Sequence, residues 1–222
     1  VRAHAEGVAV QVRCDDPPEE EIGTHLLVAV GRVPNTDDLG LEETGIETNQ
    51  FGYIEVDDYL CTTETDVWAI GDVNGRGAFT HTSYNDYEIV AANLFDDDPR
   101  IVMDRIVCFG LFIDPPLGRV GMTEREVRAS GRRALMGKRM MTRVSRAREF
   151  GETHGFIKIL VDADTEEILG AAILGLNGDE AVHSLLDVMY AKQPYTVISR
   201  AVHIHPTVSE LIPTVLQELS PL

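Results

Sequence analysis

The feature that most constrains the fold of this chain is the apolar run Val67-Trp68-Ala69-Ile70, which ends in Gly71 and Asp72. Four consecutive apolar residues indicate a strand buried on both faces, as in the parallel sheet of an α/β protein. Open α/β sheets bind ligands at the carboxyl ends of such strands. There a glycine lets a ligand approach the backbone, and an aspartate offers two acceptor oxygens to hydroxyl groups. Alternatively, Asp72 merely ends the strand or caps the segment that follows.

A second apolar strand, Val28-Ala29-Val30, ends in a similar way, in Gly31 and Arg32, and a proline then forces an extended exit. The patterns predict further strands at residues 8–13, 25–30 and 51–56, with an acidic turn at 15–21 between the first two. An isolated pair of strands is only marginally stable. The first two strands are therefore expected to complete a sheet whose other strands precede them.

A helix is expected within residues 79–95, because apolar side chains recur there at helical spacing: Tyr87, Val90, Ala91, Leu94 and Phe95. Ser83 or Asn85 would cap it. The start of a helix presents free backbone donors and the positive end of the helix dipole, which suits an electron-rich ligand.

The pattern changes after a charged break at residues 96–100, which contains Pro99. We place a domain boundary near residue 104, which gives domains 1–104 and 105–222. The second domain is expected to be an α+β layer arrangement, an antiparallel sheet flanked by helices. Its expected strands are 106–112, 119–122, 133–142, 156–162 and 167–174, with a hairpin turn at 162–165. Its expected helices are 124–130, capped by a T-x-x-E box, 179–193, and 207–219 with a bend at Pro213.

Near the end of the chain, His205 and Glu210 stand five residues apart and are joined through Pro206, which fixes one backbone angle. A carboxylate that orients an imidazole is a general-base arrangement. Two other interpretations remain open. Thr207 and Glu210 fit a capping box, and His203 and His205 would share one face of a strand that Glu210 could join to bind a metal.

Three of these stretches resemble one family in the same order and spacing. The run HIHPTVSEL resembles the C-terminal signature of the flavoprotein disulfide reductases, the group that contains dihydrolipoamide dehydrogenase, glutathione reductase and mercuric reductase. The run TETDVWAIGD resembles the second FAD-binding motif of that family, and VAVGRVPN resembles its crossover from the nicotinamide nucleotide domain to the flavin domain. The stretch from Phe112 to Glu124 resembles the start of the family's dimerisation domain.

The resemblance implies a role for each candidate residue. Gly31, Arg32 and Gly71 would lie beside the cofactor, and Asp72 would bind a ribityl hydroxyl of FAD. Thr80, His81 and Thr82 would lie against the isoalloxazine, although His81 could equally be a surface or capping residue. His205, oriented by Glu210, would move a proton at the flavin site of the partner in a homodimer. No metal is implied.

The fold class expected from this resemblance is an α/β remnant of FAD- and NAD(P)-binding domains followed by an α+β dimerisation domain. The chain lacks the G-x-G-x-x-G turn that holds a pyrophosphate and a paired-cysteine motif, since Cys14, Cys61 and Cys108 stand far apart. In the family both features come earlier in the sequence. Because the chain also begins at Val1, we expect it to be the C-terminal half of an FAD-dependent, NAD(P)H-using disulfide oxidoreductase.

The composition of the chain limits the classes of partner that it can bind. The net charge of −18 would repel a nucleic-acid backbone. The sequence contains no run of about eighteen apolar residues, the length that a membrane span needs. The sparse, unpaired cysteines favour a reducing, cytoplasmic setting. The resemblance implies a small-molecule or disulfide acceptor. The rival hypothesis is a dimerisation or interaction module with no catalytic activity of its own.

Overall fold

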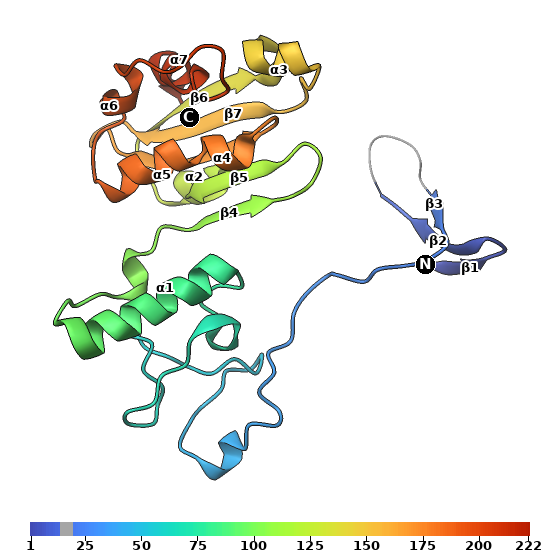
Figure 1. Cartoon of the computed structure of the whole chain (residues 1–222), viewed down its shortest axis with the longest axis vertical. Helices are drawn as coiled ribbons and strands as arrows, with labels where there is room; N and C mark the ends of the chain where they lie inside the picture. Colours follow the sequence, from blue (N-terminus) through green and yellow to red (C-terminus); the bar gives the residue numbers. More distant parts are fainter. Residues whose placement is uncertain (14–19) are drawn as a thin grey trace.

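The computed structural model describes residues 1–13 and 20–222. It begins with a three-stranded antiparallel sheet in the order β1 (Arg2–His4), β2 (Gly7–Gln11), β3 (Glu20–Gly23). Strand β2 confirms the first expected strand in a shorter form. Cys14 and most of the expected acidic turn lie outside the described residues. Figure 1 shows this sheet standing apart from the rest of the chain, joined to it by a long extended segment.

The strand expected at residues 25–30 is wrong. Within the described residues this segment is irregular and pairs with no strand. Leu27 and Val30 are 88% and 92% exposed. An apolar strand of a parallel sheet needs neighbours that satisfy its backbone and cover its side chains. Within residues 1–13 and 20–222 no strand pairs with this segment, so its apolar character does not produce a strand.

The short hairpin strand expected at residues 51–56 and the parallel-sheet strand expected at 67–70 are also wrong. Each segment forms only an isolated antiparallel bridge, Thr48 with Ile54 and Cys61 with Trp68. Between them lies a small core in which Leu60, Ile89 and Val102 are buried. Short helical turns form at η1 (Leu41–Glu43), η2 (Gly71–Asn74) and η4 (Val102–Asp104).

The expected helix at 79–95 is confirmed. It is α1 (Thr80–Ala91), which continues as a π-helical turn, η3 (Ala92–Asp96). The predicted caps are wrong, because Ser83 and Asn85 lie inside the helix. The helix instead starts at Phe79, where the hydroxyl of Thr82 donates to the Phe79 carbonyl at 2.7 Å and accepts from its N–H at 3.2 Å.

The second half is built on a six-stranded sheet in the order β4-β5-β8-β7-β6-β9, and all of its neighbouring strands are antiparallel. The strands are β4 (Cys108–Leu111), β5 (Leu117–Gly121), β6 (Ala134–Met140), β7 (Phe156–Asp162), β8 (Ile168–Leu174) and β9 (Ser220–Pro221). An antiparallel sheet flanked by helices was expected, and this part of the fold class is confirmed. The boundary near residue 104 stays a prediction.

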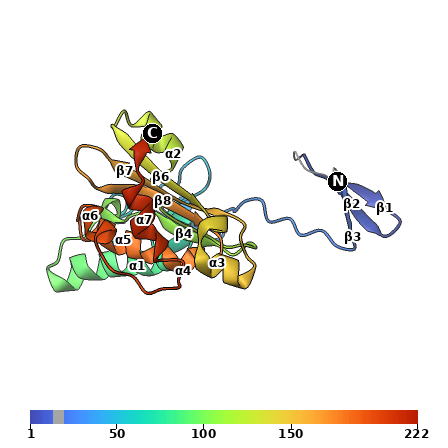
Figure 2. The same cartoon turned by 90° about the horizontal axis from the view of Figure 1, so that it is seen from above.

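The helices of this half are α2 (Glu124–Ala129), α3 (Ser145–Phe150), α4 (Gly178–Ala181), α5 (His183–Tyr190), α6 (Thr196–Ser199) and α7 (Leu211–Gln217), with a turn η5 (Met141–Arg143). Both faces of the sheet contribute to a core. Ile157, Ile159 and Val161 alternate along β7 toward Leu185 of α5 and Ile212 of α7. On the other side, Leu160 and Leu169 pack against Val127 of α2 (Figure 2).

Two expected helices differ from the structure. The helix expected at 179–193 is divided into α4 and α5, and the one expected at 207–219 starts only at Leu211. Pro213 is the third residue of α7, where a backbone N–H would have no helical partner in any case. The expected bend at Pro213 is therefore wrong. Strand β9 pairs with the edge of β6 and was not expected.

Two predictions that rest on residues close in the sequence are confirmed. Thr123 accepts from the Glu126 N–H at 3.0 Å, and the Glu126 carboxylate accepts from the Thr123 N–H at 2.7 Å, which confirms the capping box of α2. The hairpin turn between β7 and β8 is also confirmed. The backbone N–H groups of Thr165 and Asp164 donate to Asp162 and, with Arg132, lower the pKa of its carboxyl. Among the described residues, no helix has the length and apolar character needed to cross a bilayer.

Candidate functional site

The structure brings two of the predicted glycine-led motifs together. The Arg32 guanidinium donates to the Asp72 carboxylate at 3.0 Å, and both side chains are more than half exposed. They line one cavity of about 300 Å³, to which Pro34, Tyr53 and Ala78 also contribute. Gly71 immediately precedes Asp72 and has a φ of 79°, a conformation that strongly favours glycine. This arrangement presents one carboxylate and one guanidinium to any ligand in the cavity.

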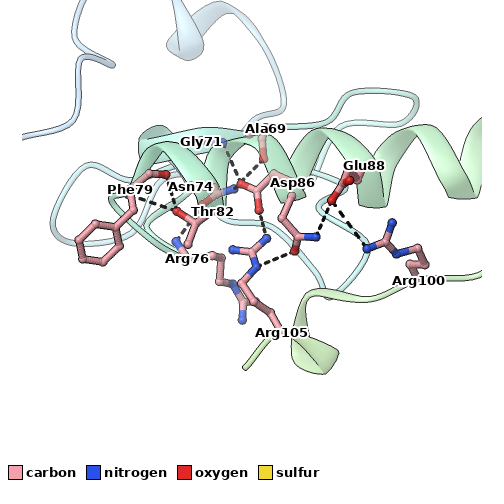
Figure 3. Close-up of polar contacts among 11 residues, drawn as sticks. Ala69, Gly71, Asn74, Arg76, Phe79, Thr82, Asp86, Glu88, Arg100 and Arg105 are labelled. Carbon is pink, nitrogen blue, oxygen red and sulfur yellow. Dashed lines mark hydrogen bonds and ion pairs between the residues drawn. The ribbon is translucent and has the colours of Figure 1, made fainter. Parts of the chain in front are cut away.

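The residues on either side of Asp72 belong to a buried polar network that the sequence patterns did not indicate. Figure 3 shows this network. The Asp86 carboxylate of α1 accepts from the Gly71 N–H at 2.8 Å and from the Asn74 amide at 2.8 Å. It also accepts from the Arg105 guanidinium. Asp86 is 2% exposed. An aspartate in mid-helix usually faces solvent, so no sequence pattern indicated that Asp86 is buried.

The three candidates at the start of α1 differ in surroundings. Thr80 and His81 are exposed, whereas Thr82 is buried and its hydroxyl is occupied by Phe79. A ring nitrogen of His81, Nε2, lies 2.9 Å from the Cys108 carbonyl oxygen. His81 also stacks on Phe79, with ring centroids 5.1 Å apart. These contacts tie the start of α1 to β4, and the roles of the three residues toward a cofactor stay predictions.

A second cavity, of about 240 Å³, lies between the start of α1 and the sheet of the second half. His81, Cys108, Phe109, Arg119 and Asp179 are among the residues that line it. Burial raises the pKa of the Cys108 thiol. Burial, followed by the nearby Asp57, also raises the pKa of Cys61. Raised pKa values keep both thiols protonated, which is unfavourable for a nucleophile.

His205 and Glu210 are in direct contact in the segment between α6 and α7. The Nδ1 atom of His205 lies 2.7 Å from Oε2 of Glu210. The Glu210 side chain is 14% exposed and that of His205 is 70% exposed. An ionised carboxylate only accepts hydrogen bonds, so it places the proton on Nδ1 and leaves Nε2 free. The arrangement presents a basic nitrogen at the surface, held by a carboxylate that is largely enclosed.

The capping-box interpretation is half correct. The Thr207 hydroxyl accepts from the Glu210 N–H at 3.2 Å, as in a capping box. The Glu210 carboxylate, however, contacts His205 and makes no reciprocal bond to Thr207 among the described contacts. His203 does not join these residues, and no group of three potential metal ligands occurs in the described part of the chain.

The two candidate centres lie in different halves of the chain. Arg32, Gly71 and Asp72 belong to the first half, and His205 and Glu210 to the second. No described hydrogen bond or ion pair joins them. A homodimer is one arrangement in which two such halves could meet, because a twofold axis brings different parts of two identical chains together.

Comparison with known sequences defines the class of protein. Residues 1–86 match the pyridine nucleotide-disulphide oxidoreductase family, and residues 108–216 match the dimerisation domain of that family. The two matches follow the order in which the nucleotide motifs and the antiparallel sheet occur in the chain. The chain belongs to the class I pyridine nucleotide-disulfide oxidoreductases.

Individual relatives agree with this assignment. The chain is 39% identical over 186 residues to the probable pyridine nucleotide-disulfide oxidoreductase RclA of Escherichia coli, covering 83% of this chain and 42% of that protein. It is 36% identical over 187 residues to a dihydrolipoyl dehydrogenase of Cupriavidus necator, covering 84% of this chain and 39% of that protein. The structure of E. coli RclA, described as an HOCl-induced flavoprotein disulfide reductase, matches with a TM-score of 0.83 and 36% identity, over 90% of this chain and 46% of that one. The chain thus spans less than half the length of these relatives.

Proposed function

We propose that this chain supplies the closing part of the flavin site and the dimerisation domain of an FAD-dependent NAD(P)H:disulfide oxidoreductase. In the intact cytoplasmic homodimer, reducing equivalents from NAD(P)H would reach a disulfide or another small acceptor. The observation that carries this proposal is the 2.7 Å contact between His205 Nδ1 and Glu210 Oε2. Family membership and the meeting of Arg32 with Asp72 support it.

The residues around Asp72 fit a flavin nucleotide. Gly71 has no side chain to obstruct the approach of a ligand, and the half-exposed Asp72 carboxylate can accept hydrogen bonds from sugar-like hydroxyls. Arg32 supplies a cation beside it. When bound, FAD would supply the ring that accepts a hydride. The protein's part here is to hold and orient that ring, and Asp72 contributes to binding.

His205 is the proposed catalytic residue. Glu210 fixes the proton on Nδ1, so Nε2 can take a proton from a thiol that becomes a thiolate and can give that proton to the thiolate released when a disulfide is reduced. The protonated ring would then stabilise the thiolate. Because Asp72 and His205 lie in different halves of the chain, His205 is proposed to act on the partner subunit's flavin site.

Replacement of His205 tests the chemical assignment in the full-length protein. His205→Ala is expected to lower turnover by about a hundredfold or more, the usual contribution of an acid/base group. The flavin content should not change, because His205 is far from the flavin-binding motif in the chain. His154→Ala, at another exposed histidine, is the matched control. Unchanged turnover in His205→Ala would leave the segment with a capping role only.

Subunit mixing tests the cross-dimer arrangement. His205→Ala subunits are mixed with Asp72→Ala subunits after denaturation and refolding together. If His205 acts on the partner's site, each mixed dimer regains one intact site, and random mixing restores roughly a quarter of wild-type activity. If His205 acts within its own subunit, no intact site forms. Activity no higher than the sum of the two parent variants would reject the cross-dimer proposal.

The second candidate is a dimerisation module without chemistry, which the dimerisation-domain match favours. The 222-residue chain itself can distinguish the candidates. Its visible absorbance measures retained flavin, and light scattering measures its mass. A colourless dimer would agree with both candidates for the isolated chain, and activity of the full-length protein would then decide between them. A monomer would contradict the dimer in both.

A further inference from the structure

The buried carboxylate of Asp86 contacts the turn on both sides of Asp72, through one backbone N–H and one side-chain amide. It accepts from the Gly71 N–H, one residue before Asp72, and from the Asn74 amide, two residues after it, both at 2.8 Å. The Asn74 amide also donates to the Ala69 carbonyl at 3.0 Å. Figure 3 shows these bonds converging from the turn onto α1. One side chain of the helix thus anchors the whole turn η2.

The direction of the Asp72 side chain depends on this turn. Gly71 adopts a φ of 79° and Gly75 a φ of 69°, so the turn is bounded by two left-handed residues. Glycine reaches these conformations at little cost, so the path of the turn is fixed by the contacts that hold it. Asp86 fixes Gly71 and Asn74, and the intervening Asp72 lines the cavity that it shares with Arg32.

Arg105 balances the charge of Asp86. Its side chain is 10% exposed, its guanidinium contacts Asp86, and its Nε donates to Asn85 at 2.9 Å. A buried ion pair contributes little to stability compared with apolar side chains of the same volume, but it fixes geometry. A leucine at position 86 could accept from neither the Gly71 N–H nor the Asn74 amide. The ion pair is therefore better explained by a need for a specific turn geometry.

We propose that Asp86 is a positioning residue of the flavin site. It does not touch the cofactor. It holds the turn at Gly71–Asn74 so that Asp72 meets the ribityl hydroxyls of FAD. Arg105 offsets the cost of burying the Asp86 carboxylate by pairing with it. This inference rests on the proposed function, since it assumes that Asp72 binds flavin.

The test compares three variants in the full-length protein: Asp86→Asn, Asn74→Ala and, as a control, Glu88→Gln. Glu88 lies on the same helix, but it pairs with Arg100 at 3.9 Å and with Asn85, and it does not reach the turn. Three quantities are measured for each protein. These are the FAD affinity of the flavin-stripped protein, the visible absorption spectrum of the bound flavin, and the melting temperature of the stripped protein.

Asp86→Asn is expected to weaken FAD binding by about tenfold or more, because the loss of bonds to a charged acceptor frees the turn. Asn74→Ala leaves the ion pair intact and should weaken binding by a smaller factor, with an altered flavin spectrum and a lower melting temperature, because the Ala69 carbonyl and Asp86 each lose a donor. Glu88→Gln should match the wild type in all three measurements. Asn74→Ala decides the case if Asp86→Asn does not fold.

Failure of the proposed function and failure of the inference about Asp86 give different results. A wild-type protein that binds no flavin overturns the proposed function, and this inference with it. A wild type that binds flavin, together with an Asn74→Ala variant and any folded Asp86→Asn variant of unchanged affinity and spectrum, overturns this inference alone. A lower melting temperature with unchanged flavin binding would show that the network only stabilises α1.

Discussion

Glu210→Gln separates the two roles that the structure gives to Glu210. Glutamine has nearly the same shape and keeps the backbone N–H that donates to Thr207 at 3.2 Å. It replaces the charged acceptor, 2.7 Å from His205 Nδ1, with a neutral one. The substitution thus changes the partner of the imidazole without changing the start of the following segment.

The expected magnitude follows from this contact. Hydrogen bonds to charged groups contribute about 1.5–3 kcal/mol, and the 70% exposure of the His205 side chain places this bond in the lower part of that range. A neutral amide oxygen recovers about half of it. The remaining loss, about 1 kcal/mol, corresponds to a turnover that is about fivefold lower. Glu210→Ala removes the acceptor entirely and should lower turnover further.

The assay measures steady-state turnover of the full-length protein and, in parallel, its thermal unfolding. For Glu210→Gln we expect reduced turnover with a free energy of unfolding within about 0.5 kcal/mol of the wild type. Thr207→Val is the counterpart, because it removes the cap contact and keeps the carboxylate. It should lower stability by about 1 kcal/mol with a smaller effect on turnover. Equal turnover for Glu210→Gln and the wild type would refute the orienting role.

Three further predictions concern the second half of the chain and are measured by its thermal or denaturant unfolding. Asp162→Ala should cost about 1–3 kcal/mol at neutral pH. Because donors led by the Thr165 N–H lower the pKa of Asp162 in the folded state, this contribution is lost as acid protonates the carboxyl. The difference from the wild type should therefore shrink below about pH 4, and a difference that grows there would contradict it. Thr123→Ala should cost about 1 kcal/mol through the lost cap of α2, whereas Thr123→Ser should cost much less. Leu185→Ala, at a fully buried position, should cost about 2–5 kcal/mol, and a loss below 1 kcal/mol would mean that the core relaxes around the cavity.

The sequence predicted those parts of the fold that depend on nearby residues. The hairpin of β7 and β8, the capping box at Thr123 and helix α1 all rest on contacts between residues close in sequence, and all three are confirmed. The strands expected at 25–30 and 67–70 failed because a parallel strand depends on neighbours from elsewhere in a protein. An apolar run indicates that a segment is buried when neighbouring strands are present. Without those neighbours the segment cannot form a strand.

The contacts of the candidate site also differ in how far they could be predicted from nearby residues. The contact of His205 with Glu210 follows from their short separation in the sequence, and the structure places them together. The meeting of Arg32 and Asp72, forty residues apart, followed from no local pattern. Asp86 was missed because a single aspartate in a helix carries no periodic signal, and its burial depends on Gly71, Asn74 and Arg105 converging on it in three dimensions.

The short strand β9 has a practical consequence for anyone who produces this protein. Ser220 and Pro221 cover the outer edge of β6, and the Leu222 N–H donates to the Ala134 carbonyl at 3.0 Å. An uncovered strand edge is a template on which other chains can pair and aggregate. Removal of Ser220, Pro221 and Leu222 would expose that edge, so we expect poorer solubility from a chain that lacks these residues.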